Sequence, residues 1–154
     1  RVPGGGSGSA DPDPGAGSGA PAPSTDEQAQ LAEFYAKAGD AALHGGDPVS
    51  AASNYQKALA ANPKNIDAVI GLGEVAVAQG VYADALRQLK KAAKLAPKSA
   101  RVHTLLGEAY LNTGNASAAE QAFKKALQID PDNARARNGY NEAAGRLPPP
   151  SDDP

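Results

Sequence analysis

The feature that most constrains this chain is a pattern of small and apolar residues that recurs every 34 positions. Gly39, Gly73 and Gly107 form one column of the pattern, and five further columns keep the same register. These are Gly46, Gly80 and Gly114; Ala51, Ala85 and Ala119; Ala58, Ala92 and Ala126; Pro63, Pro97 and Pro131; and Tyr55, Leu89 and Phe123. A fixed period of about 20 to 50 residues indicates stacked supersecondary units. The sequence therefore predicts a repeat fold.

Start and stop signals divide each unit into two helices. Residues that favour helix, chiefly Ala, Leu, Lys, Gln and Glu, dominate between the regularly placed Gly and Pro residues. In the second unit, Asn65 is a predicted helix cap and Gly80 stops that helix after Gln79. A second helix is expected from Tyr82 to Leu95. Residues 134–146 predict one closing helix without a partner.

The two ends of the chain differ in composition from the region between them. Asp47-Pro48 predicts another helix start, and Ser24 with Glu27 fits a capping box that begins the whole array. Residues 1–25 are rich in Gly, Pro and Ser and predict a disordered linker, and residues 147–154 predict a disordered tail. The predicted folded domain is therefore residues 26–146.

The columns resemble the tetratricopeptide repeat, a 34-residue unit with a signature of Leu-Gly, Tyr, Ala, Phe and Pro. The family signature begins with a Trp before the Leu-Gly pair, and no unit of this chain carries that Trp. The third unit matches best, with Leu106-Gly107, Tyr110, Ala119, Phe123, Ala126 and Pro131. The resemblance implies an all-α, right-handed solenoid. Its repeats would lie at about 32–65, 66–99 and 100–133, followed by a capping helix at 134–146.

Residues 71–76, GLGEVA, also fit a dinucleotide-binding fingerprint, which would make the protein an enzyme. That fingerprint needs a preceding strand and an acidic residue about 20 positions later, where this chain has the segment KKA at 90–92. Gly73 instead belongs to the repeat, and Gly71 is an additional glycine. We expect the repeated glycine column to allow close approach of the paired helix. The small residues expected to face it are Ala51, Ala85 and Ala119.

Composition excludes several classes of function. The chain has 154 residues, a formal charge of −2 and no Cys, and it has no apolar run long enough to span a membrane. Of its two histidines, His103 lies on the predicted packing stripe and His44 at a helix end, so both have structural interpretations. We expect no catalysis, no cofactor, no metal site and no nucleic-acid partner.

The family resemblance implies a concave inner wall, built from the first helix of each unit, that binds an extended or helical peptide. A step of about 100° per residue assigns one stripe of each first helix to this wall. The predicted peptide-groove residues are Glu33, Asp40, Leu43, His44, Asp67, Ile70, Glu74, Val77, Arg101, Thr104, Glu108, Leu111, Asn112 and Arg135.

Two columns of this stripe recur in all three units. One is always apolar: Leu43, Val77 and Leu111. It fits either packing between first helices or contacts with a peptide. The other is always acidic: Asp40, Glu74 and Glu108. It fits either a solvated surface or a carboxylate ladder, in which neighbours would repel by about 0.4 kcal/mol in water. A basic residue on a partner would relieve that repulsion.

Members of the family that hold the acidic tails of chaperones clamp carboxylates with Lys, Asn and Arg on this wall. Here Asp40 and Glu74 occupy the wall, and only Arg101 and Arg135 are cationic. We therefore expect no binding of chaperone tails. The predicted partner is a protein or peptide with apolar and basic residues.

The predicted function is that of a scaffold or adaptor for protein–protein interaction. Two alternatives stay open. In the first, the chain would be the regulatory or docking domain of a larger enzyme whose catalytic part lies upstream. In the second, it would be an assembly component of a bacterial cell-envelope complex. The Ala-, Gly- and Pro-rich composition is of a bacterial style. The compartment is cytoplasmic, or periplasmic and tethered if an upstream signal or anchor was removed.

Overall fold

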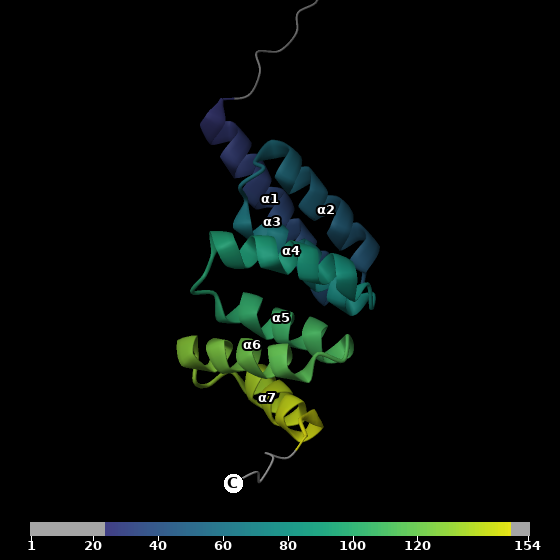
Figure 1. Cartoon of the computed structure of the whole chain (residues 1–154). Helices are drawn as coiled ribbons and strands as arrows, with labels where there is room; N and C mark the ends of the chain where they lie inside the picture. Colours follow the sequence, from purple (N-terminus) through teal and green to yellow (C-terminus); the bar gives the residue numbers. More distant parts are fainter. Residues whose placement is uncertain (1–23, 149–154) are drawn as a thin grey trace, which may run out of the picture.

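The structure, a computed structural model, describes residues 24–148. In that range the chain forms seven α-helices and no strand, which confirms the predicted all-α solenoid of three helix pairs and a closing helix. The helices follow one another along an elongated stack, with the first helix at one end and the last at the other (Figure 1). They are α1 (Thr25–His44), α2 (Pro48–Ala61), α3 (Ile66–Ala78), α4 (Tyr82–Leu95), α5 (Ala100–Asn112), α6 (Ala116–Ile129) and α7 (Ala134–Arg146).

The predicted linker lies outside the described residues except for Ser24 and Thr25, and the predicted tail does so beyond Pro148. α1 begins at Thr25, one residue before the predicted domain boundary. A search of the described helices for one that could cross a lipid bilayer found none of sufficient length and apolarity.

Local capping chemistry sets the helix ends, as the sequence predicts. The Ser24 hydroxyl accepts from the backbone N–H of Glu27, whose carboxylate accepts from the N–H of Ser24 at 2.7 Å. The Asp47 and Asn65 side chains cap α2 and α3 by accepting from the backbone N–H of Ser50 and of Ala68. Each hairpin turn contains a glycine with a φ of 72° to 81°, in the left-handed region where a Cβ is unfavourable; these are Gly46, Gly80 and Gly114.

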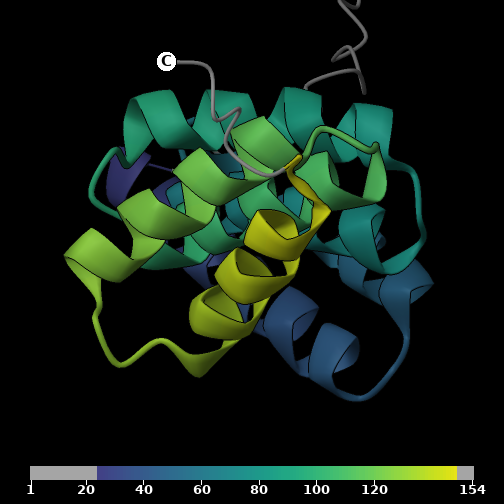
Figure 2. The same cartoon turned by 60° about the horizontal axis from the view of Figure 1, so that its bottom comes forward.

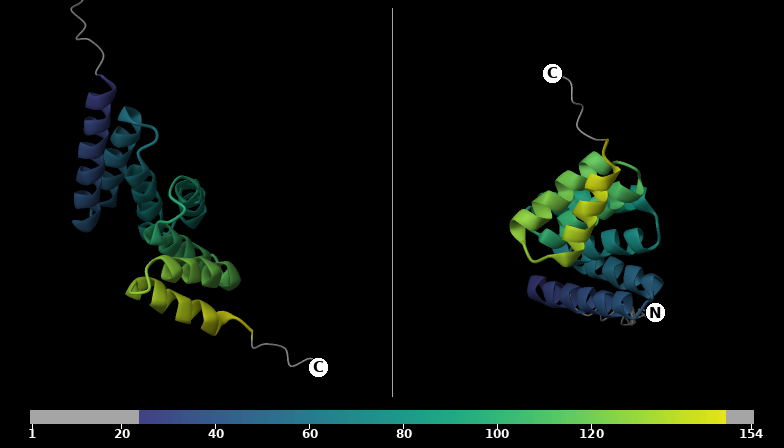
Figure 3. Two further views of the ribbon diagram at one scale, coloured as in Figure 1. Left: turned by 90° about the vertical axis from the view of Figure 1, so that its left-hand side faces the viewer. Right: turned by 90° about the horizontal axis from the view of Figure 1, so that it is seen from below.

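The first and second helices of the units occupy different sides of the stack. Each helix contacts the next one along the chain, and the first helices also contact each other, α1 with α3, α3 with α5 and α5 with α7. The second helices α2, α4 and α6 make no such contacts among themselves. The first helices therefore form the inner side of the curved stack and the second helices its outer side, as the two views of Figure 3 allow the reader to follow.

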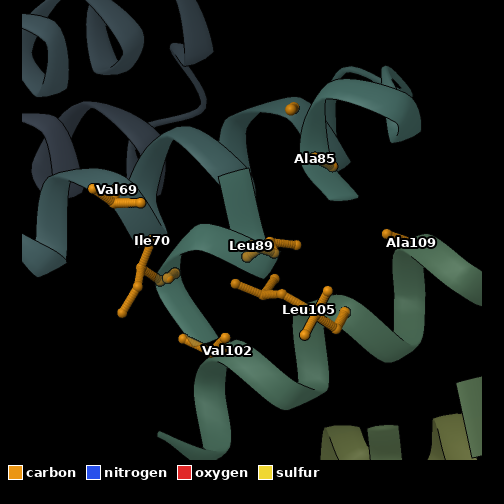
Figure 4. Close-up of a cluster of buried hydrophobic side chains, with 10 residues drawn as sticks. Val69, Ile70, Ala85, Leu89, Val102, Leu105 and Ala109 are labelled. Carbon is orange, nitrogen blue, oxygen red and sulfur yellow. The ribbon is translucent and has the colours of Figure 1, made fainter. Parts of the chain in front are cut away.

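The core runs through the stack as three apolar clusters, each centred on the large residue of a second helix. In the middle cluster, Leu89 of α4 lies beside Leu105 of α5, with Val69 and Val102 close by (Figure 4). His103 is 5% exposed, and its Nε2 lies 2.9 Å from the carbonyl oxygen of Pro97. The structure thus confirms its interpretation as a buried structural imidazole.

The repeated glycine column permits close helix approach, and the atoms nearest to it belong to the large residues of the second helices. A Cβ built on Gly39 or Gly107 would lie 2.6 Å from a ring atom of Tyr55 or Phe123, and one on Gly73 would lie 2.7 Å from Leu89. The large column of the second helix therefore supplies the atoms nearest to the glycines, and the expectation that Ala51, Ala85 and Ala119 also face them stays a prediction. The aromatic rings need the room that a missing side chain leaves.

Gly71, which the repeat pattern does not explain, has the same role between units. A Cβ at Gly71 would lie 2.6 Å from Cε2 of Tyr55, which belongs to the preceding unit, and closer still to two other ring atoms. Gly139 stands in the same relation to Phe123 at the interface of α6 and α7. At the middle interface, where the large residue is the smaller Leu89, the equivalent of these glycines is Leu105. Each interface between units is therefore matched in size.

Candidate peptide-binding wall

The predicted groove residues lie on the inner side of the stack, on the first helices α1, α3 and α5 and on the closing helix α7. α7 crosses the end of the stack and continues the series of first helices (Figure 2). Arg135 occupies on α7 the position that Arg101 occupies on α5, 34 residues earlier. The wall is thus four helices wide.

Arginines from neighbouring units lie between the carboxylates of the acidic column. Arg101 of α5 hydrogen-bonds the carboxylate of Glu74 in the preceding unit, and its guanidinium also lies 3.7 Å from Asp40 in the unit before that. Arg135 of α7 does the same one unit later. It donates to Glu108 through Nε and through NH2 at 2.7 Å, and its NH1 lies 3.4 Å from Glu74.

These arginines change the electrostatics expected of the wall. The expected repulsion in a bare carboxylate ladder was wrong, because Arg101 and Arg135 neutralise it from the following units. Burial alone would lower the pKa of Arg101, but the hydrogen bond and the charge of Glu74 raise it overall. The hydrogen bond to Glu108 is the largest effect on Arg135 and raises its pKa, although partial burial opposes it. Both side chains are cations that pair with carboxylates of other units.

Tyr55 links the wall to the core. Its hydroxyl donates a hydrogen bond of 2.7 Å to the carboxylate of Asp40, while its ring is fully buried between α1 and α3. Burial, followed by the hydrogen bond and the charge of Asp40, raises the pKa of Tyr55 far above its usual range. The sequence analysis missed this role, because the large column looked purely apolar in Leu89 and Phe123.

Several predicted groove side chains are buried and cannot offer a contact surface to a peptide. Ile70 is 4%, Thr104 3% and Leu111 6% exposed. The Thr104 hydroxyl donates to the Ala100 carbonyl at 2.9 Å and accepts from Asn133 at 3.2 Å. Leu43 and Val77 are half-buried and pack against the core clusters. The apolar column therefore fits the packing alternative, because successive first helices lie against each other there.

The remaining predicted residues are open to solvent. Glu33 pairs with Lys37 one turn later at 2.6 Å. Asp67 lies exposed in the first turn of α3. The imidazole Nδ1 of His44 lies 2.7 Å from the Asp40 carbonyl, and the Asn112 amide donates to the Glu108 carbonyl at 2.8 Å. These last two side chains therefore bond to the ends of their own helices.

The structure adds residues of α7 that the sequence analysis omitted. A cleft of about 310 Å³ between α5 and α7 is lined by Glu108, Asn112 and Arg135 and also by Asn138, Glu142 and Arg146. Arg146 donates to the Leu111 carbonyl at 3.2 Å and pairs with Glu142. The 34-residue period carries this signal, because Asn138, Glu142 and Arg146 follow Thr104, Glu108 and Asn112 in register.

The arrangement offers polar groups for recognition along open hollows. In the described part of the chain, no group of three or more His, Cys, Asp or Glu side chains is placed to hold a metal ion. The cleft at α5 and α7 and a second of about 300 Å³ beside Arg101 and Arg135 are open hollows along the wall.

Solved structures share this architecture. The TPR domain of Arabidopsis OM64 matches with a TM-score of 0.74 and 19% identity over 78% of this chain and 99% of that domain. The first TPR domain of Spaghetti (RPAP3), bound to the HSP90 peptide SRMEEVD, matches with a TM-score of 0.72 and 19% identity. The match covers 76% of this chain and 93% of that one. A mutant O-GlcNAc transferase of Thermobaculum terrenum matches with a TM-score of 0.73 and 26% identity. The match covers 75% of this chain and 22% of the transferase.

Sequence comparison agrees with the structural comparison. A search of curated proteins gave no significant match. The family model described as "Tetratricopeptide repeat" matches residues 42–108 and, in a second overlapping window, residues 76–142. Together the windows span more than half of the 154 residues and contain the repeated Gly, Ala and Pro columns of the second and third units. The chain therefore belongs to the tetratricopeptide repeat family.

Proposed function

We propose that this protein is an interaction module that holds a peptide segment of another protein along the inner wall of its helical stack. The observation that carries the proposal is the row of charged side chains on α1, α3, α5 and α7, which neighbouring units hold in fixed positions. Such preorganisation lowers the entropy cost of binding. Solved domains of the same fold have been captured with peptides, such as RPAP3 with SRMEEVD.

The charge on the wall changes along the stack, and this supports a partner with basic residues at one end. Four carboxylates lie at the α1 and α3 end: Glu33, Asp40, Asp67 and Glu74. The cations within reach of them are Lys37 and the two arginines of the ladder. Towards α7, Arg135 and Arg146 balance Glu108 and Glu142. A Lys or Arg of the peptide would lie over the α1 and α3 end, with apolar residues over the parts of Leu43 and Val77 that their packing leaves exposed.

The test is a positional-scanning peptide library measured by fluorescence anisotropy. Asp67→Lys is the informative variant, since Asp67 is exposed and forms no ion pair with a described residue. Asp40→Lys and Glu74→Lys are less suitable, because these carboxylates bind Tyr55 and the arginines. Asp132→Lys, in the exposed turn before α7, makes the same charge change away from the wall and is the control. We expect only Asp67→Lys to reduce the preference for Lys and Arg. Equal binding of basic and acidic peptides by the unaltered chain would contradict the charge part of the proposal.

A second candidate function is the docking domain of a longer enzyme. The match to one segment of the Thermobaculum terrenum O-GlcNAc transferase shows that a stack of this kind occurs in a protein named as an enzyme. Under this proposal the wall holds a segment of the substrate protein. Crosslinking of the full-length protein to its substrate through the wall would support it, and a full-length protein without any catalytic domain would refute it.

A further inference from the structure

The outer face of α1 departs from the pattern of the other first helices. Phe34 is 64% exposed, whereas the residues at the same position of the later units are fully buried; these are Ala68, Val102 and Ala136. Leu31, one turn earlier, is 42% exposed. The ring of Phe34 meets that of Tyr35 edge-on, with centroids 5.5 Å apart. α1 therefore presents an apolar surface at the open end of the stack. The helix itself lies at the edge of the left view in Figure 3.

The later units show what kind of element covers this position. Ala68 shares a cluster with residues of α2, Val102 with residues of α4 and Ala136 with residues of α6. In each case the second helix of the preceding unit lies against the first helix of the next. The equivalent face of α1 has no preceding unit within the described residues. A helix is therefore the element whose shape fits it.

A hollow beside this face extends the contact surface. It has a volume of about 350 Å³ and is lined by Gln28, Leu31, Tyr35, Lys57, Ala60 and Ala61. Lys57 Nζ lies 5.5 Å from the centroid of the Tyr35 ring, which it flanks. In the next unit the residue equivalent to Tyr35 is Val69, whose cluster includes Leu59 of α2. An aliphatic side chain of an incoming helix would occupy the hollow in the same way.

Lys37 specifies the charge of the occupant. It stands at the position of Gly71 and Gly139, which face the large aromatic residue of the preceding second helix. Its side chain is 74% exposed and reaches only Glu33 on its own helix. A covering helix would therefore carry a carboxylate, in place of an aromatic residue, opposite Lys37. Small residues would lie on either side, because Phe34 already fills the space that Ala68 leaves open.

We propose that the outer face of α1 docks an amphipathic helix of a partner protein, with Ala-type residues against Phe34, a carboxylate against Lys37 and an aliphatic residue in the hollow. Residues 1–23 cannot supply this helix, since Val2 is their only large aliphatic residue and Gly and Pro dominate. Two copies of α1 paired about a two-fold axis at Phe34 would set one large ring against the other instead of against small residues, which disfavours a second copy of this chain.

The chain itself supplies the probe. The α2 sequence, Pro48–Ala61, has its small residues Ala51 and Ala58 around Tyr55 and an aliphatic residue at Leu59. A peptide of this sequence with Tyr55→Glu, crosslinked on its outer side to hold the helix, matches the face of α1. Titration of the isotope-labelled full chain with this peptide, followed by NMR, should shift signals of α1 and the end of α2 and leave those of Asp67 and Glu108 unchanged.

Three variants of the protein sharpen the test. Phe34→Ser should weaken binding of the peptide at least about tenfold. Val49 is another exposed apolar residue, with 72% of its surface accessible, and Val49→Ser should leave the affinity unchanged. Lys37→Glu should weaken binding of the Tyr55→Glu peptide. The same protein should bind the α2 peptide with Tyr55→Lys more tightly. Shifts on the inner wall, no binding, or equal affinities for Phe34→Ser and Val49→Ser would overturn the proposal. So would sedimentation that shows the chain pairing with itself through Phe34. None of these results tests the charge preference proposed for the inner wall.

Discussion

The size matching between units can be tested at the interface of α6 and α7. A Cβ added to Gly139 would lie 2.5 Å from Cε1 and 2.7 Å from Cε2 of Phe123, and closer still to Cζ. Ordinary carbon contacts are about 3.5 to 4.0 Å, so α7 would have to move by about 1 Å. Gly139→Leu should therefore destabilise the fold by about 2 kcal/mol. Overpacking costs about 1 to 3 kcal/mol, and the better helix propensity of Leu returns less than about 1 kcal/mol.

The double variant should recover most of this loss. Phe123→Leu alone removes part of a fully buried ring and should cost about 1 kcal/mol. Combined with Gly139→Leu it recreates the pair Leu89 and Leu105, which the middle interface already accommodates. We expect the double variant to lie within about 1 kcal/mol of the unaltered protein, so the two changes would be coupled by about 2 kcal/mol.

Urea unfolding followed by far-UV circular dichroism measures all four proteins of this cycle. Gly145→Ala, on the same helix, is the control. A Cβ added there meets nothing within 4 Å, so this change should be neutral or slightly stabilising. If the two changes add to within about 0.5 kcal/mol, the contact between these positions does not govern the interface.

Three further predictions concern the Tyr55–Asp40 hydrogen bond, the Arg101–Glu74 ion pair and the cap of α1. Tyr55→Phe should remove a pH dependence of the free energy of unfolding. Burial and the bond to Asp40 raise the pKa of Tyr55 in the folded protein. Its stabilising effect is therefore complete below about pH 10, where an unfolded Tyr titrates, and is lost as the pH rises further. Equal stability loss in both proteins on going to higher pH would refute this. Arg101→Met should lower the free energy of unfolding by about 1 kcal/mol in low salt and by less in high salt. A loss independent of salt would speak for packing instead. Ser24→Ala should cost about 1 kcal/mol through the capping box, and Thr25→Ala, beside it, should cost less; thermal melts that do not separate the two would count against the cap.

The sequence was sufficient for the architecture because its signals are local. The Ser24, Asp47 and Asn65 caps and the left-handed Gly80 each act within a few residues, so helix ends could be placed without knowledge of the stack. The 34-residue period then fixed how many units there are. His103 could be assigned to the interior for the same reason, since its position falls on the packing stripe.

The parts that could not be predicted depend on how far one unit reaches into another. Helical periodicity placed Glu74 and Arg101 on one wall, but only the stagger between α3 and α5 shows that they bond. The facing partner of Gly39 depends on the rotation of α2, which periodicity leaves free by tens of degrees. Ile70 shows a third limit. A residue on the inner stripe can still be covered by the next first helix.

The reach of Arg135 has a consequence for how the molecule comes apart. Repeat arrays are commonly treated as chains of links in which each unit is coupled only to its immediate neighbours. Arg135 also contacts Glu74, which lies beyond the adjoining unit. Detaching α7 therefore removes a countercharge from two units at once, so opening at that end weakens the middle of the array before the third unit has unravelled. The last helix therefore contributes to the stability of the second unit as well as the third.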